Sequence, residues 1–188
     1  MKQSDIVKQL SDKELSLQLV LSQMIMLGLT FLLSFLLFER VNEWLDYFSF
    51  QISDFVFYGL VPGLFIVLID LLLMKVFPRK YYDDGGINDR IFRNRSVGGI
   101  LVIALLVSVS EELLFRGVIQ TEFGYIVASI LFALVHFRYL NKPVLLVSVI
   151  FISFYIGYIF VLTENLFVTM IAHFTVDFVL GLIIRFQK

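Results

Sequence analysis

Six ionisable side chains that could take part in chemistry lie within long apolar stretches of this 188-residue chain: Glu111, Glu112, Arg116, His136, His173 and Asp177. An ionisable group at membrane depth is costly unless it is paired or faces a wet cavity, so such residues are functional candidates. Glutamate, histidine and aspartate transfer protons, activate water or bind metal ions. The sequence therefore predicts chemistry performed inside a membrane.

The two adjacent glutamates have different surroundings in a helix. Glu112 and Arg116 are four residues apart, so they share a helix face and can form an ion pair, which would keep Glu112 ionised and oriented. Glu111 lies about 100° around the helix from Glu112 and has no local partner, which makes it a candidate general base. The alternative is a structural salt bridge beside a second glutamate at a helix junction.

The chain contains only two histidines, and both fall in apolar stretches. His136 by itself would be interpreted as a hydrogen-bonded packing residue. Asp177 follows His173 by four residues, so it could fix the tautomer of His173, or both could face one substrate atom; a helix–helix hydrogen bond is the alternative. At a rise of about 1.5 Å per residue, Glu111 and these three residues fall well inside the hydrocarbon layer, where three helices could converge them on one cavity.

The composition indicates a membrane protein. The chain is 59% hydrophobic with a mean hydropathy of +0.90, well above the usual apolar share of a soluble domain. A spanning helix needs roughly 20 mostly apolar residues, and the candidates are about 15–38, 55–77, 97–120, 123–137, 143–162 and 165–186. We expect an all-α polytopic membrane protein, a bundle of about six transmembrane helices forming a single transmembrane domain over residues 1–188.

Two connecting segments have their own patterns. In residues 39–54, apolar side chains at helical spacing (Val41, Trp44, Leu45, Phe48 and Ile52) lie opposite polar ones, which predicts an interfacial helix after the first span, with a structured loop as the alternative. Residues 78–95 include Asp-Asp-Gly-Gly at 83–86 and are typical of a loop. The first apolar run is too long for a cleaved signal peptide and lacks a small-residue cleavage site.

The basic residues predict the orientation. With six spans, one side holds Lys2, Lys8, Lys13, Lys75, Arg79, Lys80, Arg90, Arg93, Arg95, Arg138, Lys142, Arg185 and Lys188. The other side holds Arg40 alone, and Arg116 lies within the third span. The positive-inside rule places both termini in the cytoplasm of a multi-pass protein of the cell membrane.

Three ordered motifs in separate spans carry a family resemblance. Residues 111–116 read EExxxR, residues 132–136 read FxxxH, and residues 173–177 read HxxxD, a form of HxxxN/D. Together they resemble the CPBP family of CAAX proteases and bacteriocin-processing or immunity proteins, also called the ABI family. The resemblance covers about residues 97–185, which would form the catalytic core.

The resemblance implies an intramembrane endopeptidase. Glu111 would activate water as the base, and His136 would help to hold that water. Glu112 and Arg116 would support the site electrostatically.

In the same comparison, His173 and Asp177 would stabilise the oxyanion of the tetrahedral intermediate. The prenyl-protein enzymes similar to this chain carry Asn at the position of Asp177. An ionised Asp cannot donate a hydrogen bond, so Asp177 would have to be protonated or act by orienting His173.

The sequence leaves metal dependence open. Two histidines and one or two carboxylates suffice for a zinc site with an open water position. The chain has no cysteine and no HExxH motif, so thiolate sites and the usual zincin helix are excluded. We expect no tightly bound cofactor, with zinc as the alternative.

The expected substrate is a membrane-tethered peptide or protein, which would enter a cavity between the last four helices, with membrane lipids around the bundle and no nucleic-acid partner. The sequence does not indicate an oligomeric state. The main alternative is a non-proteolytic membrane protein that binds a partner, such as a bacteriocin self-immunity factor or a signalling scaffold. A proton-coupled transporter is a third class, because Glu, His and Asp also serve proton relays.

Overall fold

The computed structural model describes residues 10–40 and 42–187, and these residues form helices and connecting segments without a strand. Five helical stretches are long and apolar enough to cross a membrane, as predicted for a multi-pass protein. They are α2 (Asp12–Leu37); α4 (Ile52–Asp54), η1 (Phe55–Leu60) and α5 (Val61–Val76) in series; α7 (Val97–Glu112), η3 (Leu113–Gln120) and α8 (Thr121–Phe123) in series; α10 (Pro143–Thr163); and α11 (Leu166–Phe186). The predicted fourth span is the shorter apolar helix α9 (Tyr125–Val135), which has 11 residues.

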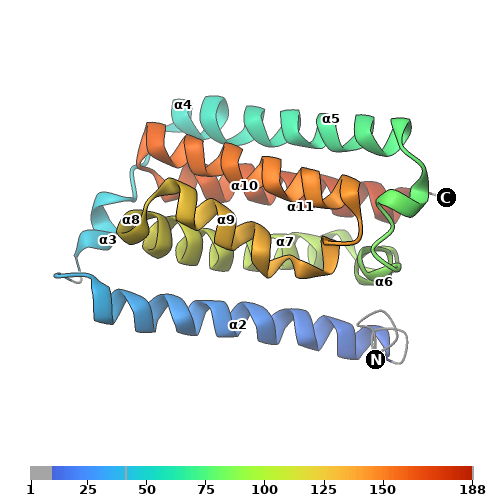
Figure 1. The fold of residues 1–188 in the computed structure, drawn as a ribbon, viewed down its shortest axis with the longest axis horizontal. Coiled ribbons are helices and arrows are strands. Elements are labelled where there is room, and N and C mark those ends of the chain that lie inside the picture. Colours follow the sequence, from blue (N-terminus) through green and yellow to red (C-terminus); the bar gives the residue numbers. More distant parts are fainter. Residues whose placement is uncertain (1–9, 41, 188) are drawn as a thin grey trace.

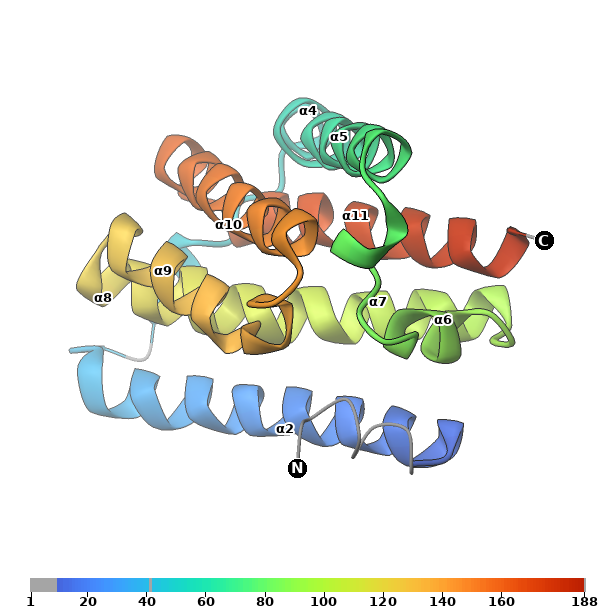
Figure 2. The same ribbon diagram turned by 45° about the vertical axis from the view of Figure 1, so that its right-hand side comes forward.

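The helices run roughly alongside one another, with α2 at one edge of the bundle and α5 at the opposite edge (Figures 1 and 2). Between them, α11 packs against α7, α5 and α10, while α2 packs mainly against α7 and η3. The start of α2 and the end of α11 lie at the same end of the bundle (Figure 1). Arg90 pairs there with Asp12 at 2.7 Å, and Arg93 bonds the carbonyl of Gln187 at 3.2 Å.

An even number of spans, six, predicts that the first and last helices have their outer ends on the same side of the membrane. Of the residues used in the sequence argument, Lys2, Lys8, Val41 and Lys188 lie outside the described residues.

Small residues allow the central helices to approach closely. Lipid tails are as apolar as leucine side chains, so helices in a bilayer associate through close packing rather than through a hydrophobic driving force. A Cβ atom added at Gly63 in α5 would lie 2.7 Å from the carbonyl oxygen of Ala172 and 2.7 Å from Cβ of Thr175, both in α11. At Gly157 in α10, an added Cβ would lie 2.9 Å from the ring of Tyr125. These two glycines set the distances of α5 from α11 and of α10 from α9.

The expected interfacial helix over residues 39–54 is wrong as a continuous element. Among the described residues of this segment, only α3 (Glu43–Asp46) and α4 are helical. The segment between them is held by the beginning of α11, because the side chain of Asn165 donates to the carbonyl of Ser49 at 2.7 Å and Leu166 N–H donates to the carbonyl of Tyr47 at 2.8 Å. These long-range hydrogen bonds take backbone groups that a continuous helix would use itself.

The expected loop over residues 78–95 contains two short helices, η2 (Arg79–Tyr81) and α6 (Ile87–Phe92). The Asp-Asp-Gly-Gly turn precedes α6, and the two carboxylate oxygens of Asp84 accept the N–H groups of Ile87 at 3.0 Å and Asn88 at 3.1 Å. The carboxylate therefore caps α6, and each of its oxygens is occupied by a backbone N–H group of that helix.

Replacement of Gly63 by alanine tests the close packing of α5 on α11. The added methyl group meets backbone and Cβ atoms that cannot rotate away, so we expect Gly63→Ala to lower the free energy of unfolding by about 1–3 kcal/mol. Gly98→Ala is the matched control, because an added Cβ there meets nothing within 4 Å. Unfolding in mixed detergent micelles should show the difference, and equal midpoints for the two variants would contradict the packing argument.

Candidate functional site

A fully buried ion pair lies at the point where α7 continues into the π-helix η3. Arg116 Nε is 3.3 Å from Glu112 Oε2, and neither side chain has any exposed surface. The predicted pairing of these two residues is thus present. π-Helical segments are rare and occur frequently at functional sites. Here the segment carries Arg116 itself.

The guanidinium of Arg116 also reaches α10. It donates to the carbonyl of Ser153 at 3.1 Å and to Gln120 Oε1 at 3.5 Å, while Gln120 donates to the carbonyl of Gly157 at 2.8 Å. The face of the Phe132 ring lies 5.3 Å from the guanidinium carbon. The buried charge is therefore surrounded by acceptors and by an aromatic face.

Glu112 also holds His173, from α11. His173 Nδ1 is 2.9 Å from Glu112 Oε1. A carboxylate paired with an arginine only accepts hydrogen bonds, so Nδ1 carries a proton and Nε2 is turned away from Glu112. Asp177 Oδ2 lies 3.6 Å from Nε2, beyond a good hydrogen bond. Glu112, rather than Asp177, is thus the residue that fixes the ring of His173.

Glu111 differs from its neighbour in that one of its oxygens is not engaged. Oε1 accepts a weak hydrogen bond from Gln23 of α2 at 3.4 Å, and Gln23 in turn accepts one from Ser110 at 2.5 Å. Oε2 receives no hydrogen bond from the described residues, and His173 Nε2 lies 3.9 Å from it. The expectation that Glu111 lacks a local partner holds along its own helix, but Gln23 reaches it from α2.

His136 lies just beyond the end of α9, one residue outside a helix that was expected to continue to residue 137. Its Nδ1 bonds the carbonyl of Phe132 at 2.8 Å, while its backbone N–H bonds Ala133 at 3.2 Å. The ring thus takes the carbonyl that the backbone N–H of a continuing helix would have used. Because a carbonyl only accepts, Nδ1 is the protonated nitrogen and Nε2 is left with a lone pair.

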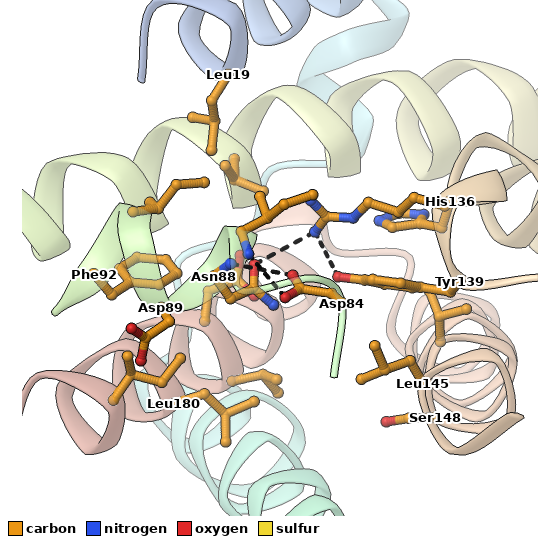
Figure 3. A pocket seen from close by; sticks show the side chains of 18 of the residues that line it. Leu19, Asp84, Asn88, Asp89, Phe92, His136, Tyr139, Leu145, Ser148 and Leu180 are labelled. Atoms are coloured by element: carbon orange, nitrogen blue, oxygen red, sulfur yellow. Dashed lines mark hydrogen bonds between the residues drawn. The ribbon is translucent and has the colours of Figure 1, made fainter. Parts of the chain in front are cut away.

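A cavity of about 790 Å³ joins these groups. Its lining includes Glu111 from α7, His136 from the end of α9, and His173 and Asp177 from α11. Glu112 and Arg116 lie behind the wall and do not line it. Figure 3 shows His136 beside Tyr139 on this cavity; their rings are stacked with centroids 5.9 Å apart. Four of the six candidate residues therefore face one space, and two support them from behind.

Two further polar residues line the cavity outside the three motifs. Gln23 lies in the first apolar span, where an amide side chain is a usable signal of such a site. Asp70 of α5 lines the cavity and accepts a hydrogen bond from Ser148 of α10. No motif links either residue to the other polar clusters.

The arrangement of donors does not fit a zinc site. Within residues 10–40 and 42–187, no three His, Asp or Glu side chains are grouped closely enough to hold a metal ion. Both nitrogens of His173 face carboxylates, and His136 has only Nε2 available. A catalytic zinc needs three protein ligands and a water position, so we derive no step through a metal.

Comparisons with known proteins agree with the motifs. A family model described as Type II CAAX prenyl endopeptidase Rce1-like matches residues 93–179, which include all six candidate residues. The chain is 44% identical over 150 residues to the uncharacterized protein YpbD of Bacillus subtilis (strain 168), covering 80% of this chain and 79% of that protein. The chain belongs to the CPBP family.

No solved structure matches the chain. The matched family model is named for an endopeptidase, and neither it nor the Bacillus relative is named for bacteriocin immunity. In this CPBP protein the matched region begins in the segment before α7 and ends within α11. It therefore spans the helices that supply the six candidate residues, while α2 and α5 add Gln23 and Asp70.

Loss of Arg116 should leave the buried carboxylate of Glu112 without its arginine partner. We expect Arg116→Met to lower the free energy of unfolding by about 3–5 kcal/mol, and the double variant Glu112→Leu/Arg116→Met to recover much of that loss. The control is Arg79→Met, whose ion pair with Asp83 is long (3.9 Å) and mostly exposed, so the change should stay within about 1 kcal/mol. Unfolding in mixed micelles measures all three variants; similar losses for Arg116→Met and Arg79→Met would contradict the role of the buried pair.

Proposed function

We propose that this protein is an intramembrane endopeptidase that hydrolyses a peptide bond of a membrane-tethered peptide or protein with an activated water molecule. One observation carries the proposal: the unengaged Oε2 of Glu111 belongs to a residue that lines the same cavity as His136 and His173. Membership in a family with an endopeptidase model supports the reaction class.

Glu111 and His136 offer two acceptors to a single water. A water that donates one hydrogen bond to Glu111 Oε2 and another to His136 Nε2 keeps an oxygen lone pair directed towards the carbonyl carbon of the peptide bond. Glu111 removes a proton from this water as the water oxygen bonds to that carbon. The protonated Glu111 then delivers the proton to the departing amine nitrogen as the C–N bond breaks, which regenerates the carboxylate.

The negative oxygen of the tetrahedral intermediate requires donors. In this proposal His173 acts as an imidazolium: Nδ1–H remains bonded to Glu112, and Nε2–H is presented to the oxyanion. Asp177, at 3.6 Å from Nε2, would stabilise the imidazolium through its negative charge and would not donate to the oxyanion. Glu112 and Arg116 hold His173 in position and do not touch the substrate.

The proposed location is the cell membrane, with the end of the bundle that holds the start of α2 and the end of α11 on the cytoplasmic side. Basic residues from separate segments support this orientation, because Arg79, Arg93 and Arg138 all line the end of the cavity formed by η2, α6 and η4 (Phe137–Tyr139). The polar end of the cavity would then open towards the cytoplasm.

Glu111→Gln and His136→Ala test the hydrolase. With the full chain in lipid nanodiscs and a pool of acyl-anchored peptides, mass spectrometry should show cleavage reduced about 10²-fold or more in each variant, because each loses a group that handles the water. Glu122→Gln, at an exposed glutamate of α8, is the matched control and should retain wild-type cleavage.

Three results would overturn the hydrolase proposal. The first is cleavage by the wild type that persists in both variants. The second is full cellular function with both residues replaced, which favours a partner-binding protein. The third is solute uptake into proteoliposomes that depends on a proton gradient, which favours a transporter.

Removal of metal tests the water-activation scheme separately. Because the donors do not form a ligand set, we expect peptide cleavage to survive prolonged chelation, and elemental analysis of the purified protein to find no stoichiometric zinc. Cleavage abolished by chelation and restored by zinc would replace this scheme with a metal-bound water.

A further inference from the structure

Arg138 is a basic residue of the cavity wall that the proposed reaction does not use. It lies in η4, two residues after His136, and its half-buried side chain lines the cavity. Its charge acts on Glu111, His136 and Asp177. A guanidinium thus lies within electrostatic reach of the groups that would perform hydrolysis.

The other arginines that line this cavity are paired. Arg79 pairs with Asp83, and Arg93 pairs with Asp89. Arg138 forms no ion pair with a carboxylate of the described residues. Asp84 is the carboxylate whose charge acts most strongly on Arg138. Both of its oxygens, however, accept N–H groups at the start of α6.

Neutral groups hold the Arg138 side chain in one orientation. Its Nη2 donates to the hydroxyl of Tyr139 at 2.5 Å and, more weakly, to Asn88 Oδ1 at 3.5 Å. The guanidinium carbon lies over the Tyr139 ring, 4.6 Å from its centroid. Figure 3 shows Asn88 and Tyr139 among the side chains that line this cavity. Nε and Nη1 donate to no group among the described residues.

A planar guanidinium that is already oriented and has unused N–H donors is suited to bidentate binding of a carboxylate. Fixing the side chain in advance lowers the entropy that binding costs. The carboxylate of a peptide is either its C-terminus or an acidic side chain. Both would bind through the same two hydrogen bonds.

We propose that Arg138 binds a carboxylate of the peptide substrate and thereby sets which peptide bond lies at Glu111. This inference rests on the proposed endopeptidase function. Arg138 is then a specificity-determining residue, and the distance along the peptide from the bound carboxylate to the cleaved bond is fixed by the cavity.

The test compares matched peptides on the full chain in nanodiscs. Random peptides with an N-terminal acyl anchor are made in three series. The first has a free C-terminal carboxylate, the second has a C-terminal amide, and the third has each internal Asp or Glu replaced by Asn or Gln. Mass spectrometry gives the cleaved bond and the rate for each. We expect the wild type to cleave one carboxylate form about tenfold faster than its neutral partner and at a constant spacing from the carboxylate. The amide series and the Asn/Gln series show which carboxylate is bound.

Arg138→Gln should raise KM for the preferred carboxylate peptides about tenfold, leave kcat within twofold, and leave cleavage of the neutral partners unchanged. Arg138→Lys keeps the charge but not the planar fork, so it should restore only part of the preference. Arg79→Gln is the control, because Arg79 lines the same end of the cavity but is paired. It should keep the wild-type preference.

The outcomes separate the two proposals. A wild type that cleaves peptides without any carboxylate preference, or a preference that Arg138→Gln retains, overturns the assignment of Arg138 alone. Cleavage that does not differ between wild type and Glu111→Gln overturns the endopeptidase and the role of Arg138 with it. If Arg138→Gln fails to fold, the carboxylate and amide pairs on the wild type and on Arg138→Lys still decide the question.

Discussion

Glu112 and Arg116 place two opposite charges without solvent exposure at the junction of α7 and η3. Removing either charge from water is expensive, and only close pairing with further hydrogen bonds offsets the cost. Those further bonds extend to other helices, through His173 in α11 and Ser153 in α10. A polar chain therefore connects three helices whose apolar surfaces alone would define their relative register only weakly.

This chain of contacts gives two adjacent glutamates different chemistry. Both carboxylate oxygens of Glu112 face a fixed cation or ring, so Glu112 can hold His173 but has no oxygen left for substrate. Glu111, one residue earlier, projects from another side of the helix and keeps one oxygen unengaged. Environment, rather than residue type, separates a supporting carboxylate from a candidate base.

The helical framework was largely predictable because length and apolar composition suffice to define a spanning helix. The prediction failed where backbone groups bond to distant parts of the chain. Asn165 and the first turn of α11 hold residues 47–49, which prevents a continuous interfacial helix. His136 ends α9 through its own ring, an interaction that apolar periodicity does not reveal.

The sequence alone determined which residue types are buried in apolar helices and, through their spacing of four, that Glu112 can reach Arg116 and Asp177 can lie beside His173. A four-residue spacing brings two side chains onto one face of the same helix, so it predicts only contacts along that helix. Packing between helices decided the rest: Gln23 meets Glu111, Asp70 meets Ser148, and Glu112 takes the Nδ1 atom of His173. These contacts join residues 61 to 88 positions apart, and only the folded chain brings them within hydrogen-bond distance.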